Sequence, residues 1–523
     1  MEKGKALKAP EKQEFTQSHN MPIHATTTQS PVIKWLLRYW AVPFSILMCV
    51  CFFVESLDVM PTYDDWYTLS SPNRDPDWLK FFLPYGSVWR PIDALMGYVA
   101  QDAHAFPLYN HIITVAAHLL STLMVFALAR RLFSNDAAVN MATTVFCISP
   151  CMLATVFACD AINQSLSLMF GMAASLAFIS MRHKVRYLLW ALLVWLAALA
   201  KDNGIAWAVV PPLLALLTEK ATQRSVARRL AFGVAIAIVY AAVRVSLPYT
   251  VIPNPEYSTF SALKKLREVA MLTGYSFIPI DWMSILCAKA REYATLFLSL
   301  CFAATMFYIL LPSLKAALTD RRTWVLAVVF GVVLSPNLLI TLSMMNAYAG
   351  LCFAAMLMAM LVEKSEAADY RLRKAVVCYI LAAITVDFHH IQEAQQTSQD
   401  GIMMASMVND ECRERQPYDE VFCVSVKDTE RKYSSFHVLP VDAFSNGQAV
   451  LWLNNYRWPM RIHEEYVEPG EYDKAIRLAQ EAVNNGGYRY AWVVEKWKVK
   501  VIEKELKKLE KLKTNAVQIR KDN

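Results

Sequence analysis

The sequence contains little charge. Only 19% of its 523 residues are Asp, Glu, Lys or Arg, whereas 56% are hydrophobic and 12% are aromatic. A soluble protein of this size needs more polar surface than such a composition supplies. The chain is therefore expected to be a membrane protein that crosses the bilayer several times.

Segments of strictly alternating hydrophobicity, the pattern of membrane barrel strands, are also missing. Apolar residues come instead in blocks of about 15 to 22, the length that a helix needs to cross a hydrocarbon core of about 30 Å. The sequence therefore predicts an α-helical polytopic membrane protein. About eleven spans are expected, near residues 36–55, 108–129, 137–158, 163–181, 186–200, 204–218, 229–247, 292–312, 323–342, 346–362 and 374–388.

The spacings of Cys and His that mark zinc motifs are absent, and no period of a tandem repeat is seen. Most of the 11 cysteines lie in apolar runs, where Cys is an ordinary small buried residue. Only Cys412 and Cys423 lie in a polar segment, where they could pair if that segment faces an oxidising compartment.

The first apolar run lacks the features of a cleaved signal peptide and is expected to stay as an anchor.

The net charge of +7 comes largely from Lys and Arg in short connections between the spans. If the chain crosses the membrane at every predicted span, the basic clusters all fall on the same side, for example Arg130–Arg131, Arg228–Arg229 and Arg321–Arg322. The positive-inside rule places that side in the cytoplasm. The charge therefore indicates topology, and no nucleic-acid partner is expected. Residues 1–33 are expected to be a disordered cytoplasmic tail.

The opposite face receives the longer connections, including the loops 56–107 and 248–291, and it collects carboxylates and carboxamides. Chemistry is therefore expected on this outer face. Residues 34–389 are expected to form the membrane catalytic domain, in which 248–291 covers the site. Amphipathic helices at the membrane interface are predicted at 78–83, 91–98 and 260–271.

Beyond residue 389 the hydropathy falls, and residues 390–523 are expected to form a small α/β domain on the outer face. Strands are predicted at 422–426, 449–453 and 490–494, and helices at 471–482 and 495–513.

Two adjacent carboxylates, Asp64 and Asp65, follow the first span directly and are flanked by Tyr63 and Trp66. Acidic pairs on a protein surface often have no function. Here the aromatic flanks, and the other charged groups expected on the same face, favour a functional role. Close carboxylates suit a general base or a ligand for a divalent cation.

This first outer loop resembles that of the GT-C class of integral-membrane glycosyltransferases. The shared features are the acidic pair, the interfacial helices, the sequence Trp89-Arg90-Pro91 and the Asn110-His111 entry to the second span. The resemblance covers roughly residues 35 to 390. It implies a glycosyltransferase, which is expected to be inverting. The compact cytoplasmic turns favour a bacterial inner membrane, and the charge pattern predicts a cytoplasmic N-terminus and a periplasmic C-terminal domain.

The resemblance also implies the substrates. GT-C enzymes of this kind take a sugar from a polyprenyl-phosphate donor, so membrane lipids and a lipid-linked sugar are expected partners. The acceptor is expected to be a glycan or a lipid-linked molecule. An O-antigen-like envelope glycan is favoured, because an outer α/β domain could hold a large polymer.

Roles for individual residues follow from the same resemblance. It implies that Asp64 or Asp65 is the general base, with a slight preference for Asp65, and that Asp160 is a second acid. Asp160 could equally cap a helix. Possible contacts to donor or acceptor are Tyr63, Trp66, Tyr257 and Asp281.

The departing phosphate requires a cation, and Arg90, Lys201 and Arg244 are all expected at the outer boundary. Two of these cations have simpler interpretations. Lys201 could pair with Asp202, and Arg244 could reach toward the interface. His104 and His111 could join the acids in binding Mg²⁺ or Mn²⁺, or they could be hydrogen-bonded only.

Two other classes of protein fit parts of the pattern. A transporter or flippase of lipid-linked glycans would carry charged residues in the middle of its spans. A glycan polymerase or ligase would have large outer loops rich in Arg and His. Few charges fall in mid-span here, and polar groups gather at one face, which favours the transferase.

Overall fold

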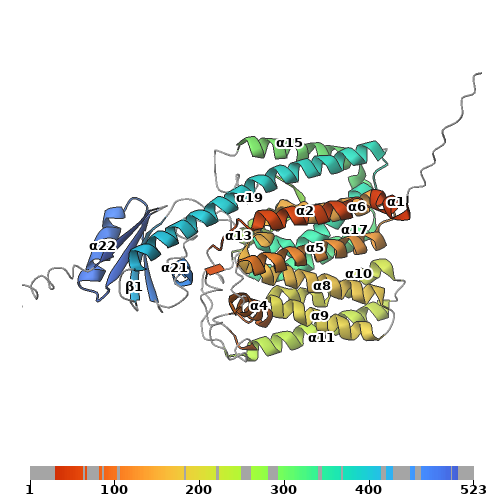
Figure 1. The fold of residues 1–523 in the computed structure, drawn as a ribbon. Helices are drawn as coiled ribbons and strands as arrows, with labels where there is room; N and C mark the ends of the chain where they lie inside the picture. The colour runs from red at the N-terminus through yellow and green to blue at the C-terminus, as the bar shows by residue number, and fades with distance from the viewer. Residues whose placement is uncertain are drawn as a thin grey trace, which may run out of the picture. The chain divides into compact units, whose positions relative to one another are not determined.

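The structure is a computed structural model, which describes most of the chain in two compact units, Met1–Arg38 and Tyr39–Asn523. The first unit contains helix α1 (Pro31–Arg38), and the second contains the remaining helices and the sheet (Figure 1). The residues described are 30–62, 65–66, 82–84, 88–102, 107–181, 184–219, 223–248, 261–280, 293–339, 344–366, 369–413, 420–427, 448–453, 461–495 and 498–503.

Every predicted span contains a helix, which confirms the polytopic helical fold. Six of the described helices are long and apolar enough to cross a membrane, or up to eight if two bent pairs each form one span. Shorter apolar helices supply the rest. The helices are α2 (Ala41–Ser56), α5 (Leu108–Leu132), α6 (Asp136–Ile148), α8 (Ile162–Ser180), α9 (Val185–Ala200), α10 (Val210–Thr218), α11 (Gln223–Ser246), α15 (Tyr293–Leu310), α17 (Arg321–Leu334), α18 (Tyr348–Glu363) and α19 (Asp369–Arg413).

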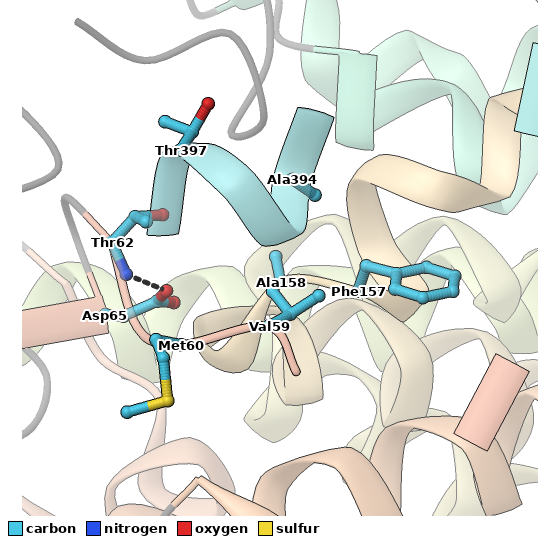
Figure 2. A pocket seen from close by; sticks show the side chains of 8 residues that line it. All are labelled: Val59, Met60, Thr62, Asp65, Phe157, Ala158, Ala394 and Thr397. Carbon is cyan, nitrogen blue, oxygen red and sulfur yellow. Dashed lines mark hydrogen bonds between the residues drawn. The ribbon is translucent and has the colours of Figure 1, made fainter. Parts of the chain in front are cut away.

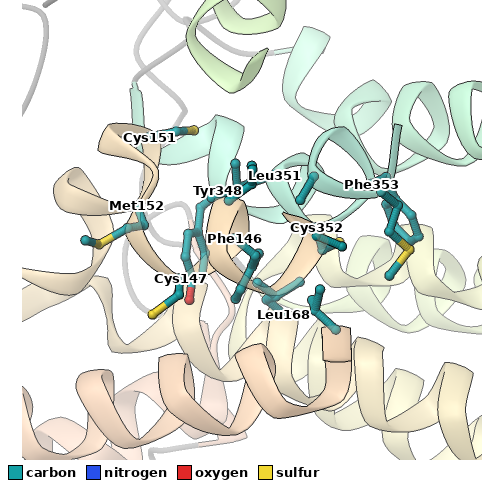
Figure 3. Close-up of a cluster of buried hydrophobic side chains, with 14 of the residues drawn as sticks. Phe146, Cys147, Cys151, Met152, Leu168, Tyr348, Leu351, Cys352 and Phe353 are labelled. Atoms are coloured by element: carbon teal, nitrogen blue, oxygen red, sulfur yellow. The ribbon is translucent and has the colours of Figure 1, made fainter. Parts of the chain in front are cut away.

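The core of the bundle lies around α6 and α18, which are buried on nearly all sides. Phe146 of α6 packs against Tyr348 of α18 in this core (Figure 3). Helices α11 and α15 instead leave large apolar side chains exposed, including Ile238 and Phe297. Helices that are apolar all round must be covered by other helices or by lipid. Helices α6 and α18 therefore form the centre of the bundle, and α11 and α15 present lipid-facing surfaces.

Connections that were predicted to share the basic side are joined by ion pairs. Glu219 binds Arg186 at 3.0 Å and Arg229 at 2.7 Å. Asp320 binds Arg322 at 2.9 Å and Lys364 at 2.8 Å. The pairs of Glu219 with Arg186 and of Asp320 with Lys364 join connections that are distant in sequence, as expected if these connections lie on one side of the membrane.

Helix α19 is longer than any predicted span. Its 45 residues extend about 68 Å at 1.5 Å per residue, more than twice the thickness of a hydrocarbon core. The first part of the helix packs along α15 (Figure 1). The boundary predicted at residue 389 therefore falls inside a continuous helix, which links the bundle to the C-terminal sheet.

The C-terminal sheet has the strand order β2-β1-β3-β4. The strands are β1 (Glu420–Val426), β2 (Arg461–Val467), β3 (Tyr490–Glu495) and β4 (Lys498–Glu503). Strand β1 is parallel to both of its neighbours, and β4 is antiparallel to β3. The predicted small α/β domain is thus present.

Both faces of this sheet are covered, because side chains alternate between the faces along each strand. Val424 and Val493 pack on the side of α22 (Tyr472–Asn484). Cys423 and Trp492 pack on the other side, against the end of α19 and helix α21 (Gln448–Leu453). Cys423 is a buried free thiol.

Two predictions in this domain were wrong. Residues 449–453 were predicted as a strand but lie in α21, because a short apolar run has no period that separates a strand from a helix. Part of the predicted closing helix is strand β4, where Val499 and Val501 are partly buried and the alternating Lys498 and Lys500 are more exposed. Strand β2 was not predicted.

Two predicted amphipathic helices form at the expected positions, as α4 (Pro91–Asp102) and α13 (Ala262–Phe277). Most of the predicted helix at 78–83 lies outside the described residues, as do residues 1–29 of the predicted tail.

Close packing in the bundle is testable at two glycines. A Cβ at Gly171 of α8 would overlap the ring of Trp207, whereas a Cβ at Gly331 of α17 would meet nothing within 4 Å. Gly171→Ala is expected to lower the free energy of unfolding by about 1–3 kcal/mol, because a rigid buried ring must move. The control Gly331→Ala should be neutral or stabilising by up to about 1 kcal/mol. Thermal melting in detergent measures both, and equal melting temperatures for the two variants would contradict the packing.

Candidate active site

Asp65 lies in a short helical stretch that follows α2, and the residue is only 4% exposed. One carboxylate oxygen accepts a hydrogen bond from the backbone N–H of Thr62 at 2.7 Å. The other accepts from the backbone N–H of Asp160 at 2.6 Å. Asp160 belongs to the short turn η3 (Cys159–Ala161) that leads into α8. The two bonds therefore fix the orientation of the carboxylate and join the first outer loop to the start of α8.

Further charged side chains gather beside this turn. Asp160 interacts electrostatically with Lys201, Asp65 and Arg90. Asp93, in the first turn of α4, interacts with Arg90, Asp160 and Lys201. We call this group the charge cluster; it consists of Asp65, Arg90, Asp93, Asp160, Asn163 and Lys201.

Asn163 connects three members of the charge cluster. Its amide nitrogen donates to a carboxylate oxygen of Asp93 at 3.2 Å and to the carbonyl oxygen of Asp160 at 2.9 Å. Its amide oxygen accepts from the Lys201 ammonium at 3.3 Å. Lys201 follows α9 directly, so Asn163 holds the ends of α4, α8 and α9 together.

Burial moves the pKa values of two groups in the charge cluster toward neutral pH. It raises the pKa of Asp93 to about 6, although the nearby Arg90 acts in the opposite direction. It lowers the pKa of Lys201 to about 7, assisted by repulsion from Arg90. Acidic and basic groups with shifted pKa values that lie close together are typical of functional sites.

Arg90 is the cation with unused bonding capacity. Among the residues that the structure describes, its guanidinium makes no ion pair, and its buried Nε has no hydrogen-bond partner. The preceding Trp89 is buried, stacks on Tyr240 and donates to the carbonyl of Phe82 at 2.9 Å. Arg90 is therefore held in place by its neighbour while its own charge stays available for an anion.

Arg244, the third predicted cation, is already paired. Its guanidinium contacts both carboxylate oxygens of Asp202, at 3.0 and 3.1 Å. The hydroxyl of Tyr240 donates to the same carboxylate at 2.8 Å. This bidentate pair neutralises Arg244, so Arg90 and Lys201 are the predicted cations that the structure brings to Asp65 and Asp160.

The remaining predicted residues are placed differently. His111 binds the carbonyl of Val59 at 3.0 Å, and within the described ranges it joins no group of three potential metal-ligand side chains. Trp66 is fully buried with Met404 and Trp492 against the C-terminal sheet, so it anchors the loop and is not exposed to a substrate. Tyr63, Asp64, His104, Tyr257 and Asp281 lie outside the described residues.

A small hollow lies beside Asp65 (Figure 2). Its walls come from the loop after α2, the turn before α8, and α19. The lining residues are Val59, Met60, Thr62, Asp65, Phe157, Ala158, Ala394 and Thr397.

Sequence reasoning missed Asp93 and Asn163. A usable signal was present, because Asp93 lies three residues after Arg90 and Asn163 three residues after Asp160. In a helix this spacing places both residues of a pair on one face. Asp160 itself makes no side-chain cap of α8, so the capping alternative is not supported.

Comparison with known proteins identifies the fold. No protein-family model matches the sequence, and no curated protein matches it. ArnT from Cupriavidus metallidurans, crystallised with undecaprenyl phosphate, is 11% identical, with a TM-score of 0.50 over 88% of this chain and 97% of its own. An Archaeoglobus fulgidus oligosaccharyltransferase, in complex with zinc and sulfate, is 13% identical, with a TM-score of 0.43 over 85% and 67%. The chain has the GT-C fold that the sequence resemblance predicted.

The pKa of Asp93 predicts a pH effect on stability. A carboxyl whose pKa is higher in the folded than in the unfolded state favours folding when protonated, so its contribution declines as pH rises from about 4 through 6. Relative to Asp93→Asn, the wild type should lose stability on the order of 2 kcal/mol over this range. Melting temperatures of the two proteins across the range measure the effect. A difference that does not change with pH would contradict it.

Proposed function

We propose that this chain is a membrane glycosyltransferase that moves a sugar from a polyprenyl-phosphate donor to an acceptor hydroxyl, with inversion at the sugar. One observation carries the proposal. The buried, oriented carboxylate of Asp65 lies in a cluster with two cations, and one of these, Arg90, has no ion-pair partner among the described residues. The GT-C fold provides the scaffold, and the undecaprenyl phosphate bound to ArnT supports the class of donor.

Asp65 is proposed as the general base. Transfer requires removal of the acceptor hydroxyl proton as the oxygen attacks the anomeric carbon. Both carboxylate oxygens of Asp65 already hold one backbone hydrogen bond, which fixes the group and leaves further lone pairs for the proton. The acid next to it in sequence, Asp64, is the alternative base.

Arg90 and Lys201 are proposed to neutralise the departing polyprenyl phosphate. Negative charge grows on the leaving oxygen during transfer, and a preorganised cation stabilises it more than bulk water does. Arg90 offers a planar set of donors that matches phosphate. Asn163 and Asp160 hold Lys201 at the same place, which reduces the reorganisation needed when the donor binds.

A divalent cation is a further part of the proposal. The carboxylates of Asp65 and Asp160 are oxygen ligands of the kind that Mg²⁺ and Mn²⁺ prefer. An ion there would supply additional positive charge for the phosphate. Lys201 and Arg90 provide such charge from the chain itself.

The acceptor is proposed to be an envelope glycan of the O-antigen type, reached from the periplasmic face of a bacterial inner membrane. The support is the joining of the C-terminal domain to the candidate site. Trp66, next to Asp65, is buried in that domain's core, and helix α19 lines the hollow beside Asp65. A large acceptor held by the domain would therefore be close to the base.

The role of Asp65 predicts a large loss of activity without a large loss of structure. Asp65→Asn keeps the shape and removes the basic oxygen, so transfer is expected to fall about a hundredfold to ten-thousandfold. Mass spectrometry of envelope glycans and of polyprenyl-phosphate-linked sugars, in cells that express each variant, measures transfer and donor consumption.

Asp473→Asn serves as the matched control, because Asp473 is exposed on α22, in the C-terminal domain. It should transfer at the wild-type rate. Wild-type glycosylation by a folded, inserted Asp65→Asn protein would rule out Asp65 as the base, and the same test on Asp64→Asn would identify the alternative.

The pKa of Lys201 predicts how donor binding depends on pH. Because burial lowers this pKa to about 7, the ammonium is lost as pH rises above neutrality, and polyprenyl phosphate should bind more weakly. Lys201→Arg should extend binding to higher pH, since guanidinium stays charged. Binding of undecaprenyl phosphate to the purified protein between about pH 6 and 9 measures this, and identical profiles for the two proteins would contradict it.

A further inference from the structure

A second cluster of reactive side chains lies inside the bundle, apart from the charge cluster. Cys49 of α2, His118 of α5 and Cys147 of α6 place one potential ligand atom each within 4.8 Å of one another. All three residues are buried, with exposures of 2%, 0% and 0%. They come from three helices, so no local sequence spacing reveals them.

We propose that Cys49, His118 and Cys147 form a binding site for one zinc ion that ties α2, α5 and α6 together. Zinc bonds of about 2.3 Å to sulfur and 2.0 Å to nitrogen place tetrahedral ligands roughly 3.5 to 4 Å apart. The three ligand atoms lie within 4.8 Å of one another, less than about 1.5 Å beyond this range. Small side-chain rotations would therefore bring the three ligand atoms to zinc-binding distance.

The bonds of His118 support a role as ligand. Its Nε2 lies 3.0 Å from the carbonyl oxygen of Cys147, which fixes the proton on this nitrogen and the lone pair on Nδ1. Metal-bound histidines commonly donate their other nitrogen to a backbone carbonyl in this way. Nδ1 now accepts from the hydroxyl of Tyr348 at 2.8 Å, a bond that the metal would replace.

Charge and ligand type select the metal. Sulfur and imidazole ligands favour zinc or copper over Mg²⁺ and Mn²⁺. Two thiolates neutralise a divalent ion but leave a monovalent copper ion with a negative charge. Since a net charge is costly in an apolar core, the divalent zinc ion fits this site better.

A fourth group nearby has unmet bonding capacity. Asp387 of α19 is 3% exposed and interacts electrostatically with Cys147. Neither of its carboxylate oxygens has a hydrogen-bond partner among the residues described. An unpartnered buried carboxyl is unfavourable in an apolar core, and a cation bound to Cys147 would lower that cost. Tyr348, in the buried cluster of Figure 3, hydrogen-bonds the His118 Nδ1 that would bind the ion.

The site can be tested on the purified full-length protein in detergent. Elemental analysis is expected to find about one zinc ion per chain in the wild type. Cys49→Ser and Cys147→Ser should lose the ion. Cys352→Ser is the matched control, because Cys352 is also buried but lies outside the cluster, and it should keep the ion.

Replacing the metal by Co²⁺ provides a second readout that does not depend on the variants. Co²⁺ added to chelator-treated wild type should give a sulfur-to-cobalt charge-transfer absorption and raise the melting temperature. A wild type without zinc that also gives no such absorption would overturn the proposal. A disulfide between Cys49 and Cys147, detected by mass spectrometry, would overturn it as well.

Discussion

A backbone hydrogen bond from Asp160 to the buried carboxylate of Asp65 is the contact on which the candidate site depends. It joins a loop that follows the first membrane helix to the turn that begins α8, 95 residues later. A buried carboxylate is unfavourable unless its oxygens are hydrogen-bonded, so this bond both permits the burial and fixes the geometry. The start of α4 and the end of α9 then reach the same place through Asn163.

The C-terminal domain belongs to this arrangement because the chain returns to the first loop. Ser398 of α19 accepts from the backbone N–H of Met60 at 3.0 Å, and Gln395 donates to the carbonyl of Glu55 at 2.9 Å. Trp66 completes the connection by filling the core under the sheet. Asp65 is thus held from two sides, by the bundle through Asp160 and by the C-terminal domain through Trp66. A change in the packing of that domain would be transmitted to the carboxylate.

The two clusters of the bundle differ in their chemistry. The charge cluster combines carboxylates with cations and suits an anionic, oxygen-rich substrate. The group of Cys49, His118 and Cys147 is apolar in its surroundings and offers soft ligands. His111 and His118 lie two turns apart on α5, so one helix contacts both the first outer loop and the interior cluster. A stabilising ion in the interior would therefore stiffen a helix that supports the candidate site.

The sequence alone determined the fold class and the approximate positions of the membrane helices, because hydrophobic length and charge placement are properties of contiguous residues. It also indicated Asp65, Asp160, Arg90 and Lys201, since these follow or precede apolar runs on one face. Short elements of the C-terminal domain were harder to predict, as α21 shows, because packing against α19 decides between helix and strand when the apolar run is short.

Only the tertiary structure decided which charges meet and which are already neutralised. Arg244 and Lys201 look alike in sequence, yet Asp202 binds the guanidinium of Arg244 while Lys201 reaches Asn163. Trp66, a possible substrate contact by its place in the sequence, is buried in the core under the sheet. The cysteines of α2 and α6 looked like ordinary buried residues until the helices brought their sulfurs beside His118. Contacts of this kind join residues far apart in the chain, so they depend on helix packing and leave no local pattern.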